Sequence, residues 1–422
     1  MSKQAKVVVV GSGGREHALA WKLSASESVK KIFCLPGNGG TALAAKCQNV
    51  AIEINDFKGI VDFCRQNKVD LVVIGPDNPL ADGIVDYLRD HDIRVFGPRK
   101  ESARLEWSKA YAKRFMTECG LPTAQYAICA SFDEAREVVR THEWARVIKA
   151  DGLALGKGVF VCDNEAEAIT ALNAVFHEKR FGAAGQRVVI EEKLDGEELS
   201  LLLLCDGNTF LPLQACQDHK RRFDEDKGPN TGGMGAYSPV RLYDECAAEI
   251  EEKVLAPLKL ALLKGKLDYQ GVLYLGLMVS RSKAGDKGTS RFSPYVLEFN
   301  ARFGDPETQA VLPRMRSDLY PLLYACTEGN LKEQSIDWAA EAACCVVAVA
   351  KSYPESSSKG KALTVGDLPP GAMLFHAGTK LEGGQVVTNG GRVLAATALA
   401  PTMEGAKALA YRALDSVSFE DM

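Results

Sequence analysis

The chain has 422 residues, of which 46% are hydrophobic and 25% charged, and its formal net charge is -4. These values are close to those of ordinary globular proteins and argue against a disordered or fibrous chain. The slightly acidic balance provides no overall attraction to nucleic acid or to an acidic membrane surface. A chain of this length is expected to form about two to four packed units.

The twelve cysteines include no CxxC pair, so neither a disulfide framework nor structural zinc is expected. The chain passes from its first six residues directly into Val7–Val10, and this start is too short for the regions of a signal peptide. No run approaches the roughly 18 apolar residues that would span a bilayer. We therefore expect a cytoplasmic protein with reduced thiols that binds neither nucleic acid nor membrane.

The first hundred residues alternate short apolar runs with helical patterns. The runs KVVVVG, KIFCLPG, LVVIGPD and IRVFGP predict strands, and residues 16–23, 57–66 and 82–89 predict helices. Buried apolar strands that alternate with amphipathic helices are typical of a doubly wound parallel sheet. Ligands of such sheets bind at the carboxyl ends of the strands.

A glycine-rich loop follows the first strand and reads Gly11, Ser12, Gly13, Gly14, Arg15, Glu16. It resembles the dinucleotide fingerprint GxGxxG, but Glu16 stands at the position where a small residue would allow the strand and helix to pack closely. The carboxylate of Glu16 would also face the pyrophosphate of a dinucleotide. This mismatch argues against an oxidoreductase with a bound dinucleotide. The loop suits a single phosphate or carboxylate at a helix N-terminus. The alternative is a plain strand-to-helix turn.

A second unit begins near Ser102, where a charged helical pattern runs to the Gly120-Leu121-Pro122 stop. Further on, the cluster from Lys149 to Gly158 is not a Walker A loop, because its glycine spacing is too short and a strand pattern follows it. It predicts a glycine-rich hairpin whose amides and two lysines could close over a triphosphate. A simple surface hairpin is the alternative.

The strand from Tyr295 to Arg302 carries the densest chemistry. A period of two places Glu298, Asn300 and Arg302 on one face and Leu297, Phe299 and Ala301 on the other. Glu298 and Asn300 offer hard oxygen ligands for magnesium, and Arg302 would neutralise a phosphoryl group beside it. A polar edge strand is the alternative, although the following turn adds two more acids, Asp305 and Glu307.

A polar stretch between residues 217 and 239 holds Asp218, His219, Lys220 and Arg221, followed by a glycine-rich segment. Lys220 and Arg221 offer anion contacts, and the amides of residues 231–233 could face one oxyanion. His219 is a general base or an orienting residue, and the pattern leaves both open. After residue 330, the strand patterns AACCVVAVA, AMLFHAG and RVLAATALA predict a third unit with few catalytic side chains.

An ordered set of stretches runs nearly end to end: VVVVGSGGREHALAWKL, LPGNGGTA, VVIGPDNPL, LEWSKAYAKRFM, VIKADGLALGKGV, VIEEKLDGEELS, LPLQACQDHKRRFDEDKGPNTGGMGAYSP, VLEFNARFGDPETQ, FHAGT and TNGGRVL. This set resembles the phosphoribosylamine–glycine ligases of the ATP-grasp superfamily. The resemblance implies an α/β protein with an N-terminal doubly wound parallel sheet that binds substrate (1–104), a central ATP-grasp fold with a mobile lid subdomain (105–329, lid about 123–194) and a small C-terminal α+β domain (330–422).

The resemblance also implies a role for individual residues. ATP would be bound by Lys109, Lys149, Gly152, Gly156, Lys157, Gly158, Glu191, Glu192, Lys193, Leu194 and Glu198, with Glu191 to Leu194 as the adenine hinge. The metal, Mg²⁺ or Mn²⁺, would be held by Glu298 and Asn300. The substrates would be bound by Gly13, Gly14, Arg15, Glu16, Asp77, Asn78, Thr231, Gly232 and Gly233, and Asp218, Lys220, Arg302 and Asp305 would line the reaction centre.

The reaction implied is the ATP-dependent ligation of glycine to 5-phosphoribosylamine through glycyl phosphate, in purine biosynthesis, by a monomer. Two alternatives remain at this point. One is another ATP-grasp carboxylate–amine ligase of nucleotide metabolism, although QDHKR and GPNTGGMGAYSP argue against it. The other is a regulatory protein that binds a nucleotide without turnover.

Overall fold

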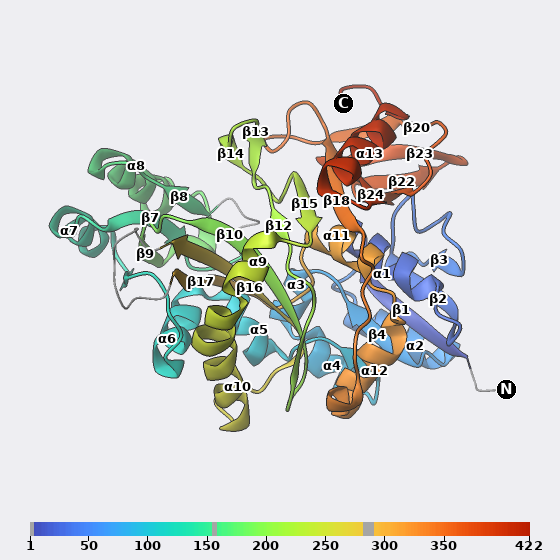
Figure 1. Cartoon of the computed structure of the whole chain (residues 1–422), viewed down its shortest axis with the longest axis horizontal. Coiled ribbons are helices and arrows are strands. Elements are labelled where there is room, and N and C mark those ends of the chain that lie inside the picture. Colours follow the sequence, from blue (N-terminus) through green and yellow to red (C-terminus); the bar gives the residue numbers. More distant parts are fainter. Residues whose placement is uncertain (1–3, 154–157, 282–290) are drawn as a thin grey trace.

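The computed structural model describes residues 4–153, 158–281 and 291–422. In Figure 1 the N-terminal part lies at the lower right, a small sheet with two helices lies at the left, and the C-terminal part lies at the upper right. A central sheet lies between them. In the part of the chain described, no helix is both long enough and apolar enough to cross a membrane.

The N-terminal part contains the predicted parallel sheet, with strand order β3-β2-β1-β4-β5. Strands β1 and β4 are apolar runs buried on both faces, as the sequence predicted. The strands are β1 (Ala5–Gly11), β2 (Val29–Pro36), β3 (Cys47–Asn49), β4 (Leu71–Ile74) and β5 (Val95–Phe96), and the helices are α1 (Gly14–Ser24), α2 (Phe57–Asn67), α3 (Asp77–Asp82), α4 (Ile84–Asp90) and α5 (Lys100–Trp107).

The chain order places a crevice at the carboxyl ends of β1 and β4. From β1 the chain continues to β2 and β3 on one side, and it then returns to β4 on the other side. Such a reversal is the usual ligand site of a doubly wound sheet. Helices α1 and α3 begin at this crevice, so the loop at Gly13 and the turn at Asp77 lie on the same edge of the sheet.

The central antiparallel sheet has the order β11-β10-β16-β17 and is buried on both faces. In β10, Leu201 and Leu203 pack with α6, α9 and α10, whereas Leu202 and Leu204 pack with the N-terminal sheet and α12. The elements are β10 (Glu197–Asp206), β11 (Phe210–Pro212), β16 (Gln270–Arg281), β17 (Phe292–Asn300), α6 (Lys109–Cys119), α9 (Arg241–Ile250), the π-helical turn η2 (Glu251–Leu255), α10 (Ala256–Leu263), α11 (Glu307–Arg314), α12 (Leu319–Glu328) and η3 (Leu331–Glu333).

The small sheet at the left of Figure 1 has the order β6-β9-β7-β8 and its own apolar core. Helices α7 and α8 cover one face, against Ile148 and Ile190, and the other face is turned toward the central sheet. The elements are β6 (Tyr126–Cys129), α7 (Phe132–Thr141), β7 (Ala145–Ala150), β8 (Val159–Val161), α8 (Glu165–Phe176), η1 (Gly182–Gly185) and β9 (Val188–Glu192). We call this unit, residues 123–194, the lid.

The C-terminal sheet includes strands from the middle of the chain. Its order is β12-β15-β18-β24-β21, and β15 pairs antiparallel with β18. The three C-terminal strands predicted from the sequence are present as β18, β21 and β24. The elements are β12 (Gln217–Asp218), β13 (Arg221–Phe223), β14 (Lys227–Asn230), β15 (Gly235–Ser238), β18 (Ala342–Val349), β19 (Ser358–Ala362), β20 (Thr364–Val365), β21 (Ala372–His376), β22 (Thr379–Glu382), β23 (Gln385–Gly390), β24 (Arg392–Ala400), α13 (Met403–Asp415) and β25 (Val417–Ser418).

Two local predictions are wrong. The helix expected from Ser102 to the Gly120 stop is broken at Ser108, which is extended and whose side chain accepts from the Tyr111 amide to cap α6. In β17 a bulge interrupts the period of two: Glu298 pairs with Gly276, and Val296 pairs with Leu277. Both Val296 and Phe299 therefore enter the core, and Leu297 does not share the buried face of Phe299.

Candidate active site

The lid and the central sheet meet at a group of charged side chains. Lys149, at the end of β7, contacts both oxygens of Glu191 on β9 at 2.9 and 3.0 Å. Its Nζ also donates to the Leu297 carbonyl on β17, at 3.4 Å. Lys109, in the first turn of α6, donates to the Gly152 carbonyl at 3.2 Å. Two predicted phosphate ligands thus lie near one another, at the start of the glycine-rich loop.

Glu298 and Asn300 lie on β17, opposite these lysines. Burial alone would raise the pKa of Glu298, but the charges of Lys220, Lys149, Lys109 and Arg302 hold it below its ordinary value. The carboxylate is therefore ionised at neutral pH and is surrounded by cations. Asn300 accepts from Arg302 through Oδ1 at 3.4 Å.

Arg302 is held by a residue that the sequence analysis did not single out. Glu106, near the end of α5, accepts from Arg302 at 3.0 Å and from the backbone amide of Ala301 at 2.8 Å. Burial raises the pKa of the Glu106 carboxyl, and the guanidinium of Arg302 opposes that rise. Asp77, from the predicted substrate pocket, lies close enough that its charge acts on both groups.

Lys220 connects the predicted nucleotide and reaction residues. Its ammonium contacts Glu198 at 2.7 Å and Glu298 at 3.9 Å. Burial would lower the pKa of Lys220, but Glu198, Glu298 and Asp218 raise it above its ordinary value. Asp218 is half-buried, and its buried Oδ1 has no hydrogen-bond partner among the described residues. Burial, followed by the charge of Glu307, raises the pKa of Asp218 well above its usual range.

The N-terminal loop is occupied by carboxylates. Glu16 accepts from the Gly13 amide and from Arg15 Nε, both at 2.5 Å, so its carboxylate caps the N-terminus of α1. Asp305 accepts from the Arg15 amide at 3.4 Å. A Cβ at Gly14 would lie 2.5 Å from Gln309, so this position leaves no space for a side chain. Two of the amides expected to face a phosphate therefore face protein carboxylates in this conformation.

Arg392, from the stretch TNGGRVL, joins the C-terminal sheet to Asp305. It contacts the Asp305 carboxylate at 3.5 Å and donates to the Asp305 carbonyl at 2.8 Å. Burial would raise the pKa of Asp305, but Arg392 and Arg15 hold it low. A pocket of about 500 Å³ opens beside this contact. It is lined by Ser12, Gly13, Pro36, Gly37, Asp305, Tyr353, Ala377, Gly378, Thr379, Lys380, Asn389 and Arg392.

The predicted oxyanion cradle at residues 231–233 requires a correction. The Thr231 amide donates to the Lys220 carbonyl at 2.8 Å, and the Gly233 amide donates to the Thr231 hydroxyl at 3.0 Å. The Gly232 amide donates to the Tyr353 hydroxyl at 2.9 Å. The amides of Thr231 and Gly233 are thus used within the segment itself, and that of Gly232 is bound by a residue of the C-terminal region. A substrate could reach only that of Gly232, by displacing Tyr353.

The predicted adenine hinge, Glu191 to Leu194, begins in the last two residues of β9 and continues beyond it. The Glu192 amide donates to the Gln125 carbonyl at 2.9 Å, which joins the two strands that connect the lid to the body. Lys193 is exposed and contacts Asp163 of the lid at 2.7 Å, whereas Leu194 is half-buried. Of the predicted loop residues, Gly158 accepts from the Ala150 amide at 2.8 Å, and Gly156 and Lys157 lie outside the described residues. Asn78 is exposed at the start of α3.

The described residues contain no group of three or more histidine, cysteine or acidic side chains able to hold a metal ion. Glu298 and Asn300 supply one carboxylate and one amide oxygen. This small set of hard donors fits Mg²⁺, which usually keeps several waters and substrate phosphates as its other ligands. The ionised state of Glu298 agrees with such a role.

The lid and the central sheet enclose lysines, and one strand of the central sheet, β17, carries a carboxylate and an amide. This arrangement defines an ATP-grasp fold. A solved structure of this class covers 100% of the chain, with a TM-score of 0.73 at 15% identity. It is the biotin carboxylase domain of the Hydrogenobacter thermophilus 2-oxoglutarate carboxylase, in complex with MgADP, ADP and bicarbonate. The match covers 91% of the biotin carboxylase chain.

Models of the three domains of phosphoribosylglycinamide synthetase match the chain. The N domain matches residues 5–106, the ATP-grasp (A) domain 107–308 and the C domain 343–422. A phosphoribosylamine–glycine ligase of Allochromatium vinosum is 46% identical over 99% of this chain and 96% of its own length. The crystal structure of the Thermotoga maritima phosphoribosylamine–glycine ligase is 34% identical, with a TM-score of 0.81 over 99% of this chain and 98% of that chain. The chain belongs to the phosphoribosylamine–glycine ligase family of ATP-dependent ligases in purine biosynthesis.

Sequence reasoning missed Glu106, Lys113 and Arg392. Glu106 and Lys113 lie in a charged helical pattern that resembles a solvated surface, and only the tertiary fold brings Glu106 to the end of β17 and Lys113 to Glu191 on β9. A charged residue on the apolar stripe of the helix would have been the available signal. Arg392 has no local signal other than its place between a glycine turn and an apolar strand.

Proposed function

We propose that the chain joins glycine to 5-phosphoribosylamine in two steps. In the first, a glycine carboxylate oxygen attacks the γ-phosphorus of ATP, the bond to the bridging oxygen breaks, and ADP leaves. In the second, the amine attacks the carbonyl carbon of glycyl phosphate, the carbon–oxygen bond breaks, phosphate leaves, and the amine nitrogen loses a proton. The observation that carries the proposal is the gathering of Lys109, Lys149, Lys220 and Arg302 around Glu298.

These cations suit a triphosphate. An ATP between the lid and the central sheet would bring several negative charges to the four cations around Glu298, three of which also contact Glu191, Glu198 or Glu106. Phosphoryl transfer depends mainly on positioning and on charge neutralisation, which is what fixed ammonium and guanidinium groups supply. Gly152 to Gly158 would close over the phosphates, and residues 191–194 would hold the adenine.

The metal ion would be held by Glu298 and Asn300, and the choice between Mg²⁺ and Mn²⁺ is part of the proposal. When bound, it would neutralise phosphate oxygens and help to orient the triphosphate. Arg302, fixed by Glu106, would lie beside the transferred phosphoryl group and compensate its charge.

Glycine would bind with its amino group toward Asp218. A buried oxygen without a hydrogen-bond partner is costly, and an ammonium donor would remove that cost and stabilise the ionised carboxylate. Lys220, on the same segment, would bind the carboxylate that becomes phosphorylated. Glycine would thus be held at both of its charged ends.

The acceptor would occupy the pocket between the N-terminal loop and the C-terminal sheet. Arg392 and Lys380 line it with positive charge, and Asp305 offers an acceptor for ribose hydroxyls or the amine. In this proposal residues 105–329 bind ATP, with 123–194 as the moving lid, while residues 1–104 and 330–422 hold phosphoribosylamine. We further propose that the protein is cytoplasmic, since all twelve cysteines are free, and that it acts as a monomer.

The test measures ADP release with ATP, Mg²⁺ or Mn²⁺, glycine and freshly generated phosphoribosylamine, omitting one component at a time. We expect turnover only in the complete mixture. Turnover that continues without glycine would refute the assignment of the carboxylate substrate, and ATP binding without any turnover would favour a regulatory protein. Glu298→Gln should abolish turnover with the fold unchanged, and near-normal activity would show that the metal site is misplaced.

A further inference from the structure

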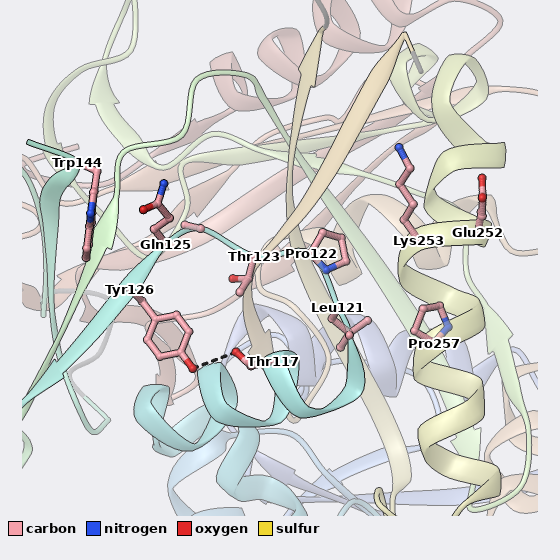
Figure 2. A pocket seen from close by; sticks show the side chains of 12 residues that line it. Thr117, Leu121, Pro122, Thr123, Gln125, Tyr126, Trp144, Glu252, Lys253 and Pro257 are labelled. Carbon is pink, nitrogen blue, oxygen red and sulfur yellow. Dashed lines mark hydrogen bonds between the residues drawn. The ribbon is translucent and has the colours of Figure 1, made fainter. Parts of the chain in front are cut away.

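Helix α6 contacts the lid at its start and near its end. At its start, Asp151 of the lid accepts from the Ser108 hydroxyl at 3.2 Å and from the Ala110 amide at 3.0 Å. Near its end, the Thr117 hydroxyl lies 3.0 Å from the Tyr126 hydroxyl on β6. Figure 2 shows this pair facing each other across the chain segment that leads into the lid. Between these two contacts lies Lys113.

Lys113 is a buried cation, with only 1% of its surface exposed. Its Nζ contacts Glu191 at 2.8 Å and donates to the Thr123 hydroxyl at 2.7 Å. The Thr123 hydroxyl in turn donates to the Val296 carbonyl on β17, at 2.7 Å. One ammonium group therefore binds Glu191 in the lid and is linked, through Thr123 at the start of the lid, to β17, the edge strand that carries the proposed metal ligands.

Glu191 is shared between Lys113 and Lys149. The two ammonium groups lie 2.8 and 2.9 Å from its carboxylate, and the group carries one net positive charge. Burial lowers the pKa of Lys113 to about 8, against the raising effect of Glu191, so this lysine is mostly charged at neutral pH. If Lys113 were neutral, Glu191 and Lys149 would form a closed pair without net charge.

We propose that Lys113 is a positioning residue: by sharing Glu191 with Lys149, it keeps a net positive charge on this group for the ATP phosphates and sets the lid at the angle at which Lys149 reaches them. The proposal rests on the proposed function, in which Lys149 is a phosphate ligand. Lys113 need not touch the nucleotide. Its effect is transmitted through one carboxylate, which makes it testable by paired substitutions.

The test compares Lys113→Met, Glu191→Gln and the double variant, by steady-state KM for ATP and for glycine. Lys113→Met should raise the KM for ATP about tenfold or more, since Glu191 then neutralises the charge of Lys149, and should change the KM for glycine by less than about twofold. In the Glu191→Gln background the same substitution should have little effect on the KM for ATP, because no carboxylate remains to neutralise Lys149. Lys253→Met is the control, since this lysine lies on η2 beside the connecting segment in Figure 2.

Equal rises in both KM values, or an equal effect of Lys113→Met with and without Glu191, would overturn the proposal. The comparison between Glu191→Gln and the double variant decides the question even when Lys113→Met alone is too unstable to assay. Lys149→Met separates this proposal from the one on which it rests. If Lys149→Met leaves the KM for ATP unchanged, the assignment of the ATP site fails; if it raises that KM and Lys113→Met does not, only the role of Lys113 fails.

Discussion

Replacing His17 with asparagine tests how the N-terminal domain is joined to the C-terminal sheet. His17 Nδ1 accepts from the backbone amide of His376 at 2.8 Å, so this nitrogen must be unprotonated in the folded protein. Burial, and then the nearby His376, lower the pKa of His17 from 6.5 to about 3. Because the folded pKa is lowered, the unfolded chain binds the proton first as the pH falls, and stability is lost below the unfolded pKa.

The size of the effect follows from the pKa difference. A pH of about 5 is roughly 1.5 units below the pKa of the unfolded His17 side chain, while the folded side chain is still neutral. This difference corresponds to about 2 kcal/mol of lost stability relative to pH 7. His17→Asn keeps an acceptor near the position of Nδ1 but does not titrate, so it should lose about 2 kcal/mol less over that range. Urea unfolding at both pH values measures this, with the exposed His142→Asn as control. An unchanged pH dependence in His17→Asn would refute the reasoning.

Two further substitutions test the supports of the site. Glu106→Ala leaves the Ala301 amide and the Arg302 guanidinium without their buried partner, so the free energy of unfolding should fall by about 3–5 kcal/mol. The kcat should fall by a larger factor than the KM for ATP rises. Chemical denaturation and steady-state kinetics measure the two effects, and a normal kcat would contradict the role of Arg302; the second substitution is at Gly152. Gly152→Ala should raise the KM for ATP, because its Cβ would lie 2.4 Å from the Cβ of Ala184 and displace the start of the closing loop; an unchanged KM would show that this end of the loop tolerates movement.

The parts of the fold that were predictable are those with strong local signals. The strands β1 and β4 are continuous apolar runs ending at glycine, and their burial on both faces makes their pattern readable from one chain. The break at Ser108 was hidden, because the residues on both sides favour a helix. A tertiary contact from Asp151 decides it, and the only local sign is a serine suited to an N-cap.

The candidate site shows the same division. Glu298 and Asn300 are close in sequence, and the strand pattern alone predicted them together. The bulge at Leu297 could not be predicted, since it depends on the register of the neighbouring strand. The contact between Arg392 and Asp305 joins residues 87 positions apart, and no spacing rule relates them.

The pairing of β15 with β18 bears on how the chain can fold during synthesis. One edge of Gly235–Ser238 pairs with the earlier strand β12, but the other edge finds its partner only after Ala342–Val349 has left the ribosome. Until then, the nascent middle segment exposes an unpaired strand edge, the kind of surface on which chains aggregate. The lid has no such dependence, because β6 to β9 and their core are contiguous in sequence. A nascent chain would therefore fold its lid early. The β15–β18 pairing, which joins the proposed ATP-binding and acceptor regions, would form last.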